Sequence, residues 1–405
     1  MTIVLLEALT FGLGRLVDAA AAAGHRLRLL TGHRSIYTHE LSRLHPDQLD
    51  VVDVDTADPA ACLAALRDVD DLAGLISSTD TWALPGAELT AALGLPGPDA
   101  AAVRVLRDKG QVRTRLHAAG LSRGPATTDL GHLPASVGLP LVVKDSAGTS
   151  SRAVWLCRDE PELAAALAEA ATSPLKGHLV AEPYFAGPLY SAETVTWAGQ
   201  TRLLGVMSRQ ISPEPARREE AAAFPVAFTA AEAEGLGDWI TRVLAVAGLA
   251  QGFAHTEFIL TADGPEVVEV NARIGGALVG EALCRSLSTN VYAAMVSMAL
   301  GQRPDLLDGP DPTGPASGFV LVYPTTTGAL AGWSGLDRLP GFPGSPQWYP
   351  TASVGDVVDQ LADQRACTGI LLAEGPTAEI ALHRAQAAAG TIAPLVSPVR
   401  EPVPG

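Results

Sequence analysis

The stretch that decides the fold reads Gly252-Phe-Ala-His-Thr-Glu257-Phe-Ile-Leu-Thr-Ala-Asp-Gly264-Pro-Glu-Val-Val-Glu269-Val-Asn271-Ala-Arg273. Apolar and polar residues alternate on both sides of Ala262-Asp263-Gly264, which suits a hairpin loop with glycine in the left-handed region. The sequence therefore predicts two antiparallel strands. With Asp263 at the centre of the loop, Glu257 faces Glu269 directly across the hairpin.

The period of two along a strand separates this hairpin into two faces. The apolar face would pack on a core and holds Phe258, Leu260, Val268 and Val270. The polar face carries candidate site residues, namely His255, Glu257, Glu269 and Asn271. His255 could manage a proton, although a histidine on a strand is more often a packed, hydrogen-bonding residue.

Two carboxylates placed directly opposite each other on a sheet repel, so their pairing needs a cation. Oxygen ligands from Glu257, Glu269 and the Asn271 amide suit Mg²⁺ or Mn²⁺, and Mg²⁺ commonly shares its ligands with substrate phosphates. The sequence therefore predicts a metal site for a nucleotide. The alternative is an exposed acidic sheet face, because a register slip of one residue would separate the two carboxylates.

Arg273 follows Asn271 on the same face and enters Gly275-Gly276, where glycines permit close approach of the backbone to a ligand. An arginine beside a metal can offset charge on a transferred phosphate. Arg209 is a second candidate, for a substrate carboxylate, against the alternative of a surface role. We take Arg273, Gly275 and Gly276 with Arg209 as the candidate substrate residues.

An apolar strand upstream, Leu141-Val-Val-Lys144, ends in a lysine and leads into Asp145-Ser-Ala-Gly148-Thr-Ser-Ser151-Arg152. Small and hydroxylated residues between two basic ones can hold phosphates through backbone N–H groups. The order of a Walker A loop is absent, because the lysine precedes the loop. A flexible surface turn is the alternative.

Composition narrows the class of protein. The chain has 405 residues, 28 basic and 44 acidic side chains and a net charge of −16, which disfavours nucleic acid and anionic membranes as partners. Four widely spaced cysteines show neither metal nor disulfide spacing, and neither a signal peptide nor a membrane span is recognisable. These features predict a reduced, cytoplasmic protein that acts on small molecules.

The first hundred residues alternate strand-length apolar runs with amphipathic segments, which predicts βαβ units on a parallel sheet. The strands are expected at 2–8, 26–30, 51–54 and 72–77, with helices from the first strand to about Ala23 and from Pro59. Gly12 and Gly14 open an incomplete dinucleotide fingerprint, since Val17 replaces its third glycine. We prefer a tight turn into a helix over NAD binding.

The remaining chain divides at breaks rich in glycine and proline. We expect three domains, at 1–98, 99–306 and 307–405, the first a Rossmann-like parallel-sheet domain and the last an α+β subdomain. A lid is expected over about 124–190. Helices are predicted at 100–119, 160–171 and 230–247, from Val354 and from Thr377, with a strand at 318–323.

Together these motifs resemble the ATP-grasp superfamily, in which two α+β subdomains clamp ATP and activate a carboxylate as an acyl phosphate. The resemblance covers residues 100 to 300 by motif. It implies an α/β and α+β multidomain ATP-grasp fold, with Glu257, Glu269 and Asn271 as metal ligands and Lys109, Lys144 and Arg273 as catalytic residues. It assigns to ATP binding Lys109, Lys144, Gly148, Ser151, Glu182, Tyr184, Phe185 and Glu193.

Within that superfamily, Gly187-Pro-Leu-Tyr-Ser-Ala-Glu-Thr and Gly205-Val-Met-Ser-Arg209 look most like the L-amino-acid ligase branch. This implies an ATP- and Mg²⁺- (or Mn²⁺-) dependent ligase that joins a small carboxylate to an amine and releases ADP and phosphate. A larger acid, a thiol acceptor, or ATP binding without turnover are the alternatives. The substrates and the oligomeric state stay open, a homodimer among the options.

Four residues depart from the family pattern. Leu189 stands where many members place a glutamate on the ribose hydroxyls, and Pro183 removes one backbone donor from the hinge at 182–187. Ser150 and Ala153 stand where two further loop glycines are common, which should reduce the mobility of the loop.

Overall fold

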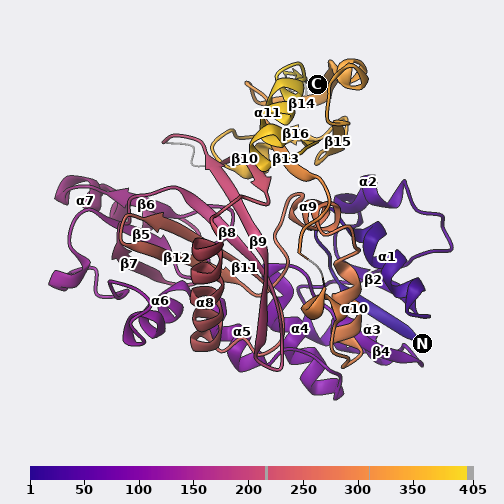
Figure 1. Cartoon of the computed structure of the whole chain (residues 1–405), viewed down its shortest axis with the longest axis horizontal. Helices are drawn as coiled ribbons and strands as arrows, with labels where there is room; N and C mark the ends of the chain where they lie inside the picture. Colours follow the sequence, from indigo (N-terminus) through magenta and orange to yellow (C-terminus); the bar gives the residue numbers. More distant parts are fainter. Residues whose placement is uncertain (215–217, 310, 399–405) are drawn as a thin grey trace, which may run out of the picture.

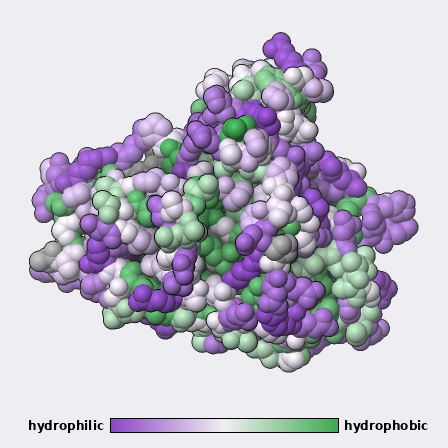
Figure 2. All heavy atoms as spheres, viewed as in Figure 1, coloured by the Kyte–Doolittle hydropathy of each residue, from purple (hydrophilic) through white to green (hydrophobic). Residues whose placement is uncertain are grey.

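The structure is a computed structural model that describes residues 1–214, 218–309 and 311–398. Figure 1 shows an N-terminal region, a small lid, a long central sheet and a C-terminal region that projects from its far end. No helix in the described ranges is long and apolar enough to cross a membrane. Figure 2 shows hydrophilic residues over most of this face, with hydrophobic residues gathered near its centre.

The N-terminal region is the expected parallel sheet, in the order β3-β2-β1-β4. Its strands are β1 (Thr2–Leu6), β2 (Arg26–Thr31), β3 (Asp50–Asp53) and β4 (Leu72–Ile76), each within two residues of its predicted bounds. They alternate with α1 (Leu13–Ala22), η1 (Arg34–Tyr37), α2 (Thr38–Leu41), α3 (Pro59–Arg67) and α4 (Asp80–Leu93). Gly12 has φ 100° in a tight turn into α1, where an added Cβ would collide with the Tyr292 hydroxyl.

The predicted basic helix at 100–119 is wrong as a single element. Asp108 breaks it into α5 (Ala100–Leu106) and α6 (Lys109–Ala118). Its carboxylate accepts a hydrogen bond from the Gln111 backbone N–H, so it acts as the N-cap of α6. The break places Lys109 at the first turn of α6 instead of in mid-helix.

The lid is a small antiparallel sheet in the order β6-β5-β7, covered by α7 (Glu160–Ala170). Its strands are β5 (Leu141–Asp145), β6 (Val154–Cys157) and β7 (Leu179–Pro183), and η2 (Ala135–Val137) precedes them. These elements fall inside the predicted lid at 124–190. Leu141, Val143 and Cys157 are buried in the core of the lid, so the alternate residues of β5 are left to face the rest of the molecule.

The central sheet has eight strands in the order β12-β11-β8-β9-β10-β13-β17-β15. They are β8 (Leu189–Trp197), β9 (Gln200–Ile211), β10 (Glu219–Phe224), β11 (Gly252–Thr261), β12 (Gly264–Asn271), β13 (Ala316–Val322), β15 (Gln347–Pro350) and β17 (Gly369–Gly375). Because β10 pairs with β13, this sheet runs through the boundary predicted at 306, so the last two predicted domains share a sheet.

Helices pack on both sides of the central sheet. The helix α8 (Ala230–Ala247) has its predicted bounds, begins with a capping box at Thr229 and Glu232, and buries its apolar stripe against Phe258 and Val267. On the N-terminal side, α9 (Val279–Ser286), α10 (Tyr292–Ala299) and η3 (Asp305–Asp308) lie between this sheet and the parallel sheet, in one continuous core.

The C-terminal region adds a three-stranded sheet, β16-β14-β18, and a helix. These elements are β14 (Gly328–Ser334), β16 (Val357–Val358), β18 (Ala393–Ser397), α11 (Ala378–Ala389), η4 (Leu336–Gly341) and η5 (Gln364–Ala366). The helix predicted from Thr377 and the strand predicted at 318–323 are confirmed, as α11 and β13. The helix predicted from Val354 is wrong, because Gly355 adopts φ 101° and the chain turns into β16.

The hairpin β11–β12 has the predicted pairs but a different turn. Glu257 lies opposite Glu269, and His255 opposite Asn271. Thr261 pairs with Gly264, so the turn has two residues, and a bulge between Glu257 and Phe258 restores the register. The bulge leaves Val268 beside the lid and directs Val267 into the core, so the prediction that Val268 is a core residue is wrong.

Candidate active site

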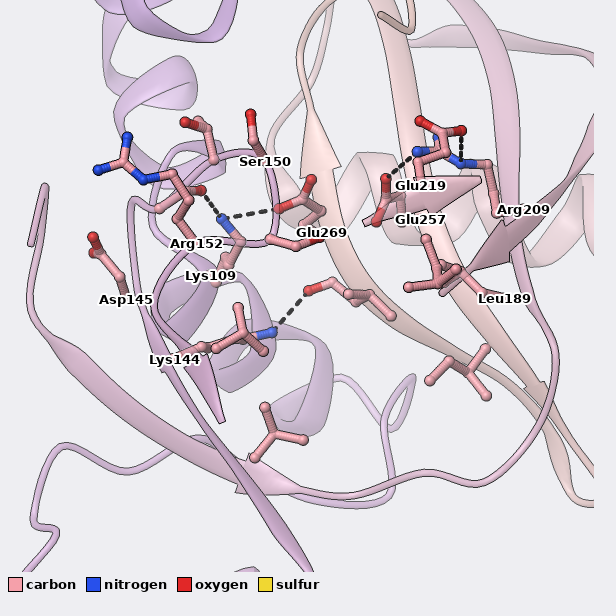
Figure 3. Close-up of a pocket in the computed structure, with 18 of the residues that line it drawn as sticks. Lys109, Lys144, Asp145, Ser150, Arg152, Leu189, Arg209, Glu219, Glu257 and Glu269 are labelled. Atoms are coloured by element: carbon pink, nitrogen blue, oxygen red, sulfur yellow. Dashed lines mark hydrogen bonds and ion pairs between the residues drawn. The ribbon is translucent and has the colours of Figure 1, made fainter. Parts of the chain in front are cut away.

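A cavity of about 890 Å³ lies between the lid and the central sheet (Figure 3). Its lining includes candidate residues from both domains of the predicted clamp, namely Lys109, Lys144, Gly148, Ser151, Glu182, Tyr184, Phe185, Arg209, Glu257, Glu269, Arg273 and Gly276. The other three, Glu193, Asn271 and Gly275, lie directly behind that wall. The fold thus brings together residues spread over 168 positions, from 109 to 276.

One part of the cavity has apolar walls on both sides. The lid supplies Val142, Val154 and Leu156, and the central sheet supplies Leu189, Ile259 and Val268. Such walls suit a flat aromatic ring. Phe185 also lines the cavity, and the guanidinium groups of Arg113 and Arg123 each lie 5.1 Å from its ring centroid. The Tyr184 backbone N–H already donates to the Pro140 carbonyl, 3.2 Å away.

Lys109 connects two parts of the site. Its Nζ lies 2.6 Å from the Gly148 carbonyl oxygen and 2.9 Å from Glu269 Oε2, as Figure 3 shows. Burial alone would raise the pKa of Glu269, but the Lys109 charge and a 2.8 Å hydrogen bond from the Asn271 amide lower it. Glu269 is therefore ionised, and Lys109 neutralises it in this state.

The loop after β5 is held in place by Asp145, the last residue of that strand. The buried Asp145 carboxylate accepts hydrogen bonds from the backbone N–H groups of Ala147, Lys176 and Gly177 at 2.7–3.0 Å. Ser150, Ser151 and Ala153 follow with φ of 53–60°. The loop thus keeps a left-handed backbone that favours glycine although two of the residues, Ser150 and Ala153, replace expected glycines.

Lys144 and Glu182 form a buried ion pair beneath this loop. Lys144 Nζ lies 2.5 Å from Glu182 Oε1 and 3.0 Å from the Val268 carbonyl, and Arg113 Nε contacts the other Glu182 oxygen at 3.2 Å. Burial opposes ionisation of Glu182, yet the two cations lower its pKa. Burial, with the nearby Arg113, lowers the pKa of Lys144. The Glu182 side chain is thus fully occupied, and its backbone pairs with Val142 in the β5–β7 ladder.

Arg209 lies at the opposite end of the cavity and is also occupied. Its Nε is 2.9 Å from Glu219 Oε1 and its Nη2 is 3.3 Å from Glu257 Oε1. Burial raises the pKa of Glu219, which the neighbouring Arg209 only partly offsets. Arg209 can meet a substrate carboxylate only if these carboxylates are displaced or neutralised, and it is buried, which contradicts the surface alternative.

His255 lies between Glu193 and Glu257. Its Nδ1 is 2.7 Å from Glu193 Oε1, and its Nε2 is 2.8 Å from Arg209 Nη1 and 3.4 Å from Glu257 Oε1. Since arginine nitrogens only donate, Nε2 accepts and the proton lies on Nδ1, facing Glu193. Burial lowers the pKa of His255, but the two carboxylates raise it to about 9. A pKa of about 9 favours the protonated ring at neutral pH, which the Arg209 contact at Nε2 opposes, so Nε2 can take up a proton only if Arg209 moves.

Glu193 does not line the cavity, unlike the other predicted ATP residues. It is 1% exposed and accepts a 2.8 Å hydrogen bond from the Ser191 hydroxyl while it pairs with His255. This position makes it a support for His255 rather than a contact for ATP.

The two hairpin carboxylates fit a divalent metal. Glu257 and Glu269 are opposite one another in register and both line the cavity (Figure 3). The Asn271 amide donates a hydrogen bond to Glu269. The described residues contain no group of three or more histidine, cysteine, aspartate or glutamate side chains arranged for a metal, so two carboxylates and an amide would need further oxygens to complete a metal site. Lys109 and Arg209 supply the neutralising charge that the pair requires in this state.

Arg273 lies two residues after the end of β12 and pairs with Asp80, a residue that sequence reasoning did not place at the site. Its Nη2 contacts the Asp80 carboxylate, at the start of α4, and its Nη1 donates to the Ile274 carbonyl at 2.9 Å. Burial lowers the pKa of Arg273, but Asp80 raises it overall, so the guanidinium stays charged. Asp80 itself lines the cavity.

The two glycines after Arg273 differ in their surroundings. A Cβ on Gly275 would come within 2.8 Å of His255 Nδ1 and 2.7 Å of both Val279 methyl groups. A Cβ on Gly276 would meet nothing within 4 Å, and Gly276 lines the cavity. Only Gly276 therefore offers open backbone to a ligand, while Gly275 allows His255 to pack.

Substituting these glycines one at a time should separate the two roles. Gly275→Ala should destabilise the fold by about 1–3 kcal/mol, because Val279 and His255 are buried and cannot move freely. Gly276→Ala should leave the urea midpoint unchanged and weaken substrate binding. Equal midpoints for both variants would contradict this assignment.

Several cavity residues were missed by sequence reasoning. They are Asp80, Arg113, Arg158, Glu214, Glu219 and Gln364. Asp80 and Gln364 come from the N- and C-terminal regions, so only the tertiary fold brings them to the site. Arg113 and Glu219 lie in helices or strands with no motif around them. Glu219 begins β10, in the same sheet as Glu257, so the alternation of side chains along that strand could have pointed to it.

Residues 137–281 match the ATP-grasp domain family, and residues 320–396 match the L-amino acid ligase C-terminal domain 2 family. Among curated proteins, the chain is 27% identical over 314 residues to the uncharacterized protein y4rH of Sinorhizobium fredii (strain NBRC 101917 / NGR234), covering 74% of this chain and 63% of that protein. It is 24% identical over 296 residues to Homo sapiens carnosine synthase 1, covering 66% of this chain and 35% of that one. The chain thus spans less than two thirds of the length of both relatives.

Solved structures share the fold along almost the whole chain. The crystal structure of L-amino acid ligase from Bacillus licheniformis has a TM-score of 0.82 at 20% identity, covering 98% of both chains. Phosphoribosylglycinamide synthetase from Anaerococcus prevotii has a TM-score of 0.73 at 14% identity, covering 98% of this chain and 99% of that one. Biotin carboxylase from Campylobacter jejuni has a TM-score of 0.74 at 14% identity, covering 98% and 92%. These likenesses, with the family match over 137–281, confirm the expected ATP-grasp fold.

Proposed function

We propose that this chain, an ATP-grasp protein, is a ligase that joins a small carboxylate to an amine at the cost of ATP, with amino acids as the first candidates for both substrates. The observation that carries the proposal is the pair Glu257–Glu269, directly opposed across a hairpin and open to a cavity that also holds Lys109, Lys144 and Arg273. The match of residues 320–396 to an L-amino acid ligase domain supports the amino-acid class.

The cavity accommodates the parts of ATP in a definite order. The apolar walls around Leu156 and Leu189 suit adenine, and the loop at Gly148 with Lys109 and Lys144 suits the phosphates. Glu257, Glu269 and Asn271 would hold Mg²⁺ or Mn²⁺, which when bound supplies positive charge beside the phosphates. Leu189 offers no hydrogen bond to a ribose hydroxyl.

The chemistry then follows from charge placement. A substrate carboxylate oxygen attacks the γ-phosphorus and ADP leaves, while Lys109 and Arg273 offset the charge on the transferred group. The amine nitrogen next attacks the carbonyl carbon of the acyl phosphate; phosphate leaves, and the amine gives up a proton. His255 Nε2 can take up this proton if Arg209 has moved and the ring is still neutral. The lid excludes water, which would otherwise hydrolyse the intermediate.

The experiment that tests this function is a screen of amino acids in pairs. ADP release is measured with MgATP and each pair, and the product mass is determined by mass spectrometry. The expected result is ADP formation that requires both substrates, with a product whose mass equals their sum less one water. A thioester product would show that the acceptor is a thiol, and a larger acyl product would show that the donor is a larger acid. ATP binding with no ADP formation from any pair would overturn the ligase and favour the non-catalytic alternative.

A further inference from the structure

We propose that Asp80 is a positioning residue that fixes Arg273 at the substrate end of the cavity and links its position to the phosphate loop at 145–152. The N-terminal region would thereby act on the transfer step through Arg273. This inference rests on the proposed function for its kinetic consequence, while the structural link itself can be measured with nucleotide alone.

Asp80 contacts two arginines from different segments. Its Oδ2 pairs with Arg273 Nη2, and its Oδ1 lies 3.6 Å from Arg107 Nη1. The side chains of Asp80 and Arg273 are each 13% exposed, so water screens this contact weakly. Because Arg273 Nη1 donates to the Ile274 carbonyl and Nη2 pairs with Asp80, these two contacts together fix the orientation of the guanidinium.

Arg107 carries the link to the phosphate loop. It lies at the junction of α5 and α6, and its Nη2 donates to the Ala147 carbonyl at 3.2 Å. Ala147 is held in turn by Asp145, whose carboxylate accepts its N–H at 3.0 Å. A chain of direct contacts therefore runs from Ala147 through Arg107 and Asp80 to Arg273. A change in the loop on nucleotide binding is transmitted along this chain to the arginine.

The charge of Asp80 is needed as well as its shape. Arg107 and Arg273 approach the same carboxylate, so without its charge the two guanidinium groups repel each other across a partly buried gap. Asparagine in this position would keep the volume and lose that attraction. Arg273 would then leave the position from which it meets a transferred phosphate, whereas the nucleotide contacts of Lys109 and Lys144 would be unaffected.

A second ion-pair group provides a matched control. Glu281 on α9 lies between Arg15 of α1, at 3.1 Å, and Arg285, at 2.8 Å. It too is a carboxylate between two arginines, it too connects the N-terminal region to the rest of the chain, and it does not line the cavity. Glu281→Gln therefore removes the same kind of contact between the same regions without touching the chain from Ala147 to Arg273.

The test compares Asp80→Asn with Glu281→Gln. Hydrogen exchange is measured with and without Mg²⁺ and the non-hydrolysable analogue AMP-PNP. In the wild-type protein and in Glu281→Gln, the analogue should protect both 145–153 and 273–276. In Asp80→Asn, protection should persist at 145–153 and be lost at 273–276. Equal protection of 273–276 in all three proteins would overturn the inference, whether or not any substrate pair is turned over.

Kinetics with the best substrate pair provide the second readout. Asp80→Asn should lower kcat by on the order of 100-fold while the KM for ATP stays near its wild-type value, because a misplaced group affects the transfer step. Glu281→Gln should leave kcat near wild type. If Asp80→Asn does not fold, Asp80→Glu replaces it, since it keeps the charge and displaces it by one methylene; its kcat should fall below that of Glu281→Gln at an unchanged urea midpoint. A kcat equal to that of Glu281→Gln would overturn the kinetic claim.

Discussion

Replacing Glu269 with alanine should reduce ADP formation by about a thousandfold or more, the largest kinetic effect expected in this protein. The change removes one of two opposed carboxylates that would hold the metal, and it also frees Lys109, whose Nζ lies 2.9 Å from Glu269 Oε2. Both losses act where charge develops during phosphoryl transfer. The rate is measured by coupled detection of ADP, with Mg²⁺ or Mn²⁺ and the best substrate pair.

Asp263→Asn is the control for this variant. Asp263 is an acidic residue of the same hairpin, but it lies in the turn, with its side chain 73% exposed and paired to Arg123. Its loss should leave turnover unchanged. If Glu269→Ala retained wild-type turnover, neither the metal site nor the ligase mechanism built on it would survive.

The sequence predicted the central features of this site because they follow from local geometry. Strand parity and a hairpin loop were enough to place Glu257 opposite Glu269 and His255 opposite Asn271. The two-residue turn was mistaken for three, yet the pairs were unaffected because the bulge at Val268 adds back one residue. That compensation cannot be seen in the pattern, since Val267 and Val268 are both apolar and either could be buried.

The parts that could not be predicted depend on contacts between distant segments. Asp80 reaches Arg273 across 193 positions, and nothing near Asp80 in the sequence marks it as part of a site. Glu182 lines the cavity as the resemblance implied, but its carboxylate is taken by Lys144. Glu193 lies behind the cavity wall, where its carboxylate is taken by His255. The wrong prediction of a helix from Val354 has a local cause that the apolar pattern did not reveal. Gly355 adopts a positive φ, which ends any helix at that point.

Replacing Arg113 with methionine should lower the free energy of unfolding by about 3–5 kcal/mol, the largest stability effect expected from a single substitution here. Arg113 is 3% exposed and contacts Glu182 at 3.2 Å, Glu266 at 3.1 Å, the Ser122 hydroxyl and the Val267 carbonyl. Methionine fills the space but leaves these acceptors unpaired in the interior. Urea denaturation at pH 7 measures the change.

Arg123→Met is the matched control, since Arg123 also pairs with Glu266, at 2.9 Å, and lies over the same Phe185 ring. Its side chain is 44% exposed, so its loss should cost only about 0–1 kcal/mol. If the two variants lost similar amounts of unfolding free energy, burial would not be what makes Arg113 contribute more than Arg123.

The pH dependence gives an independent check on Arg113. Although burial raises the pKa of Glu182, Arg113 and Lys144 hold it below its ordinary value in the folded protein. The stability that this ionised group contributes is therefore complete above its unfolded pKa, about 4.3, and is lost as the pH falls through the folded pKa. The deficit of Arg113→Met should accordingly be largest near neutral pH and shrink as the medium is acidified below about pH 4. A deficit that grew on acidification would show that Arg113 stabilises the fold by a means other than its charge on Glu182.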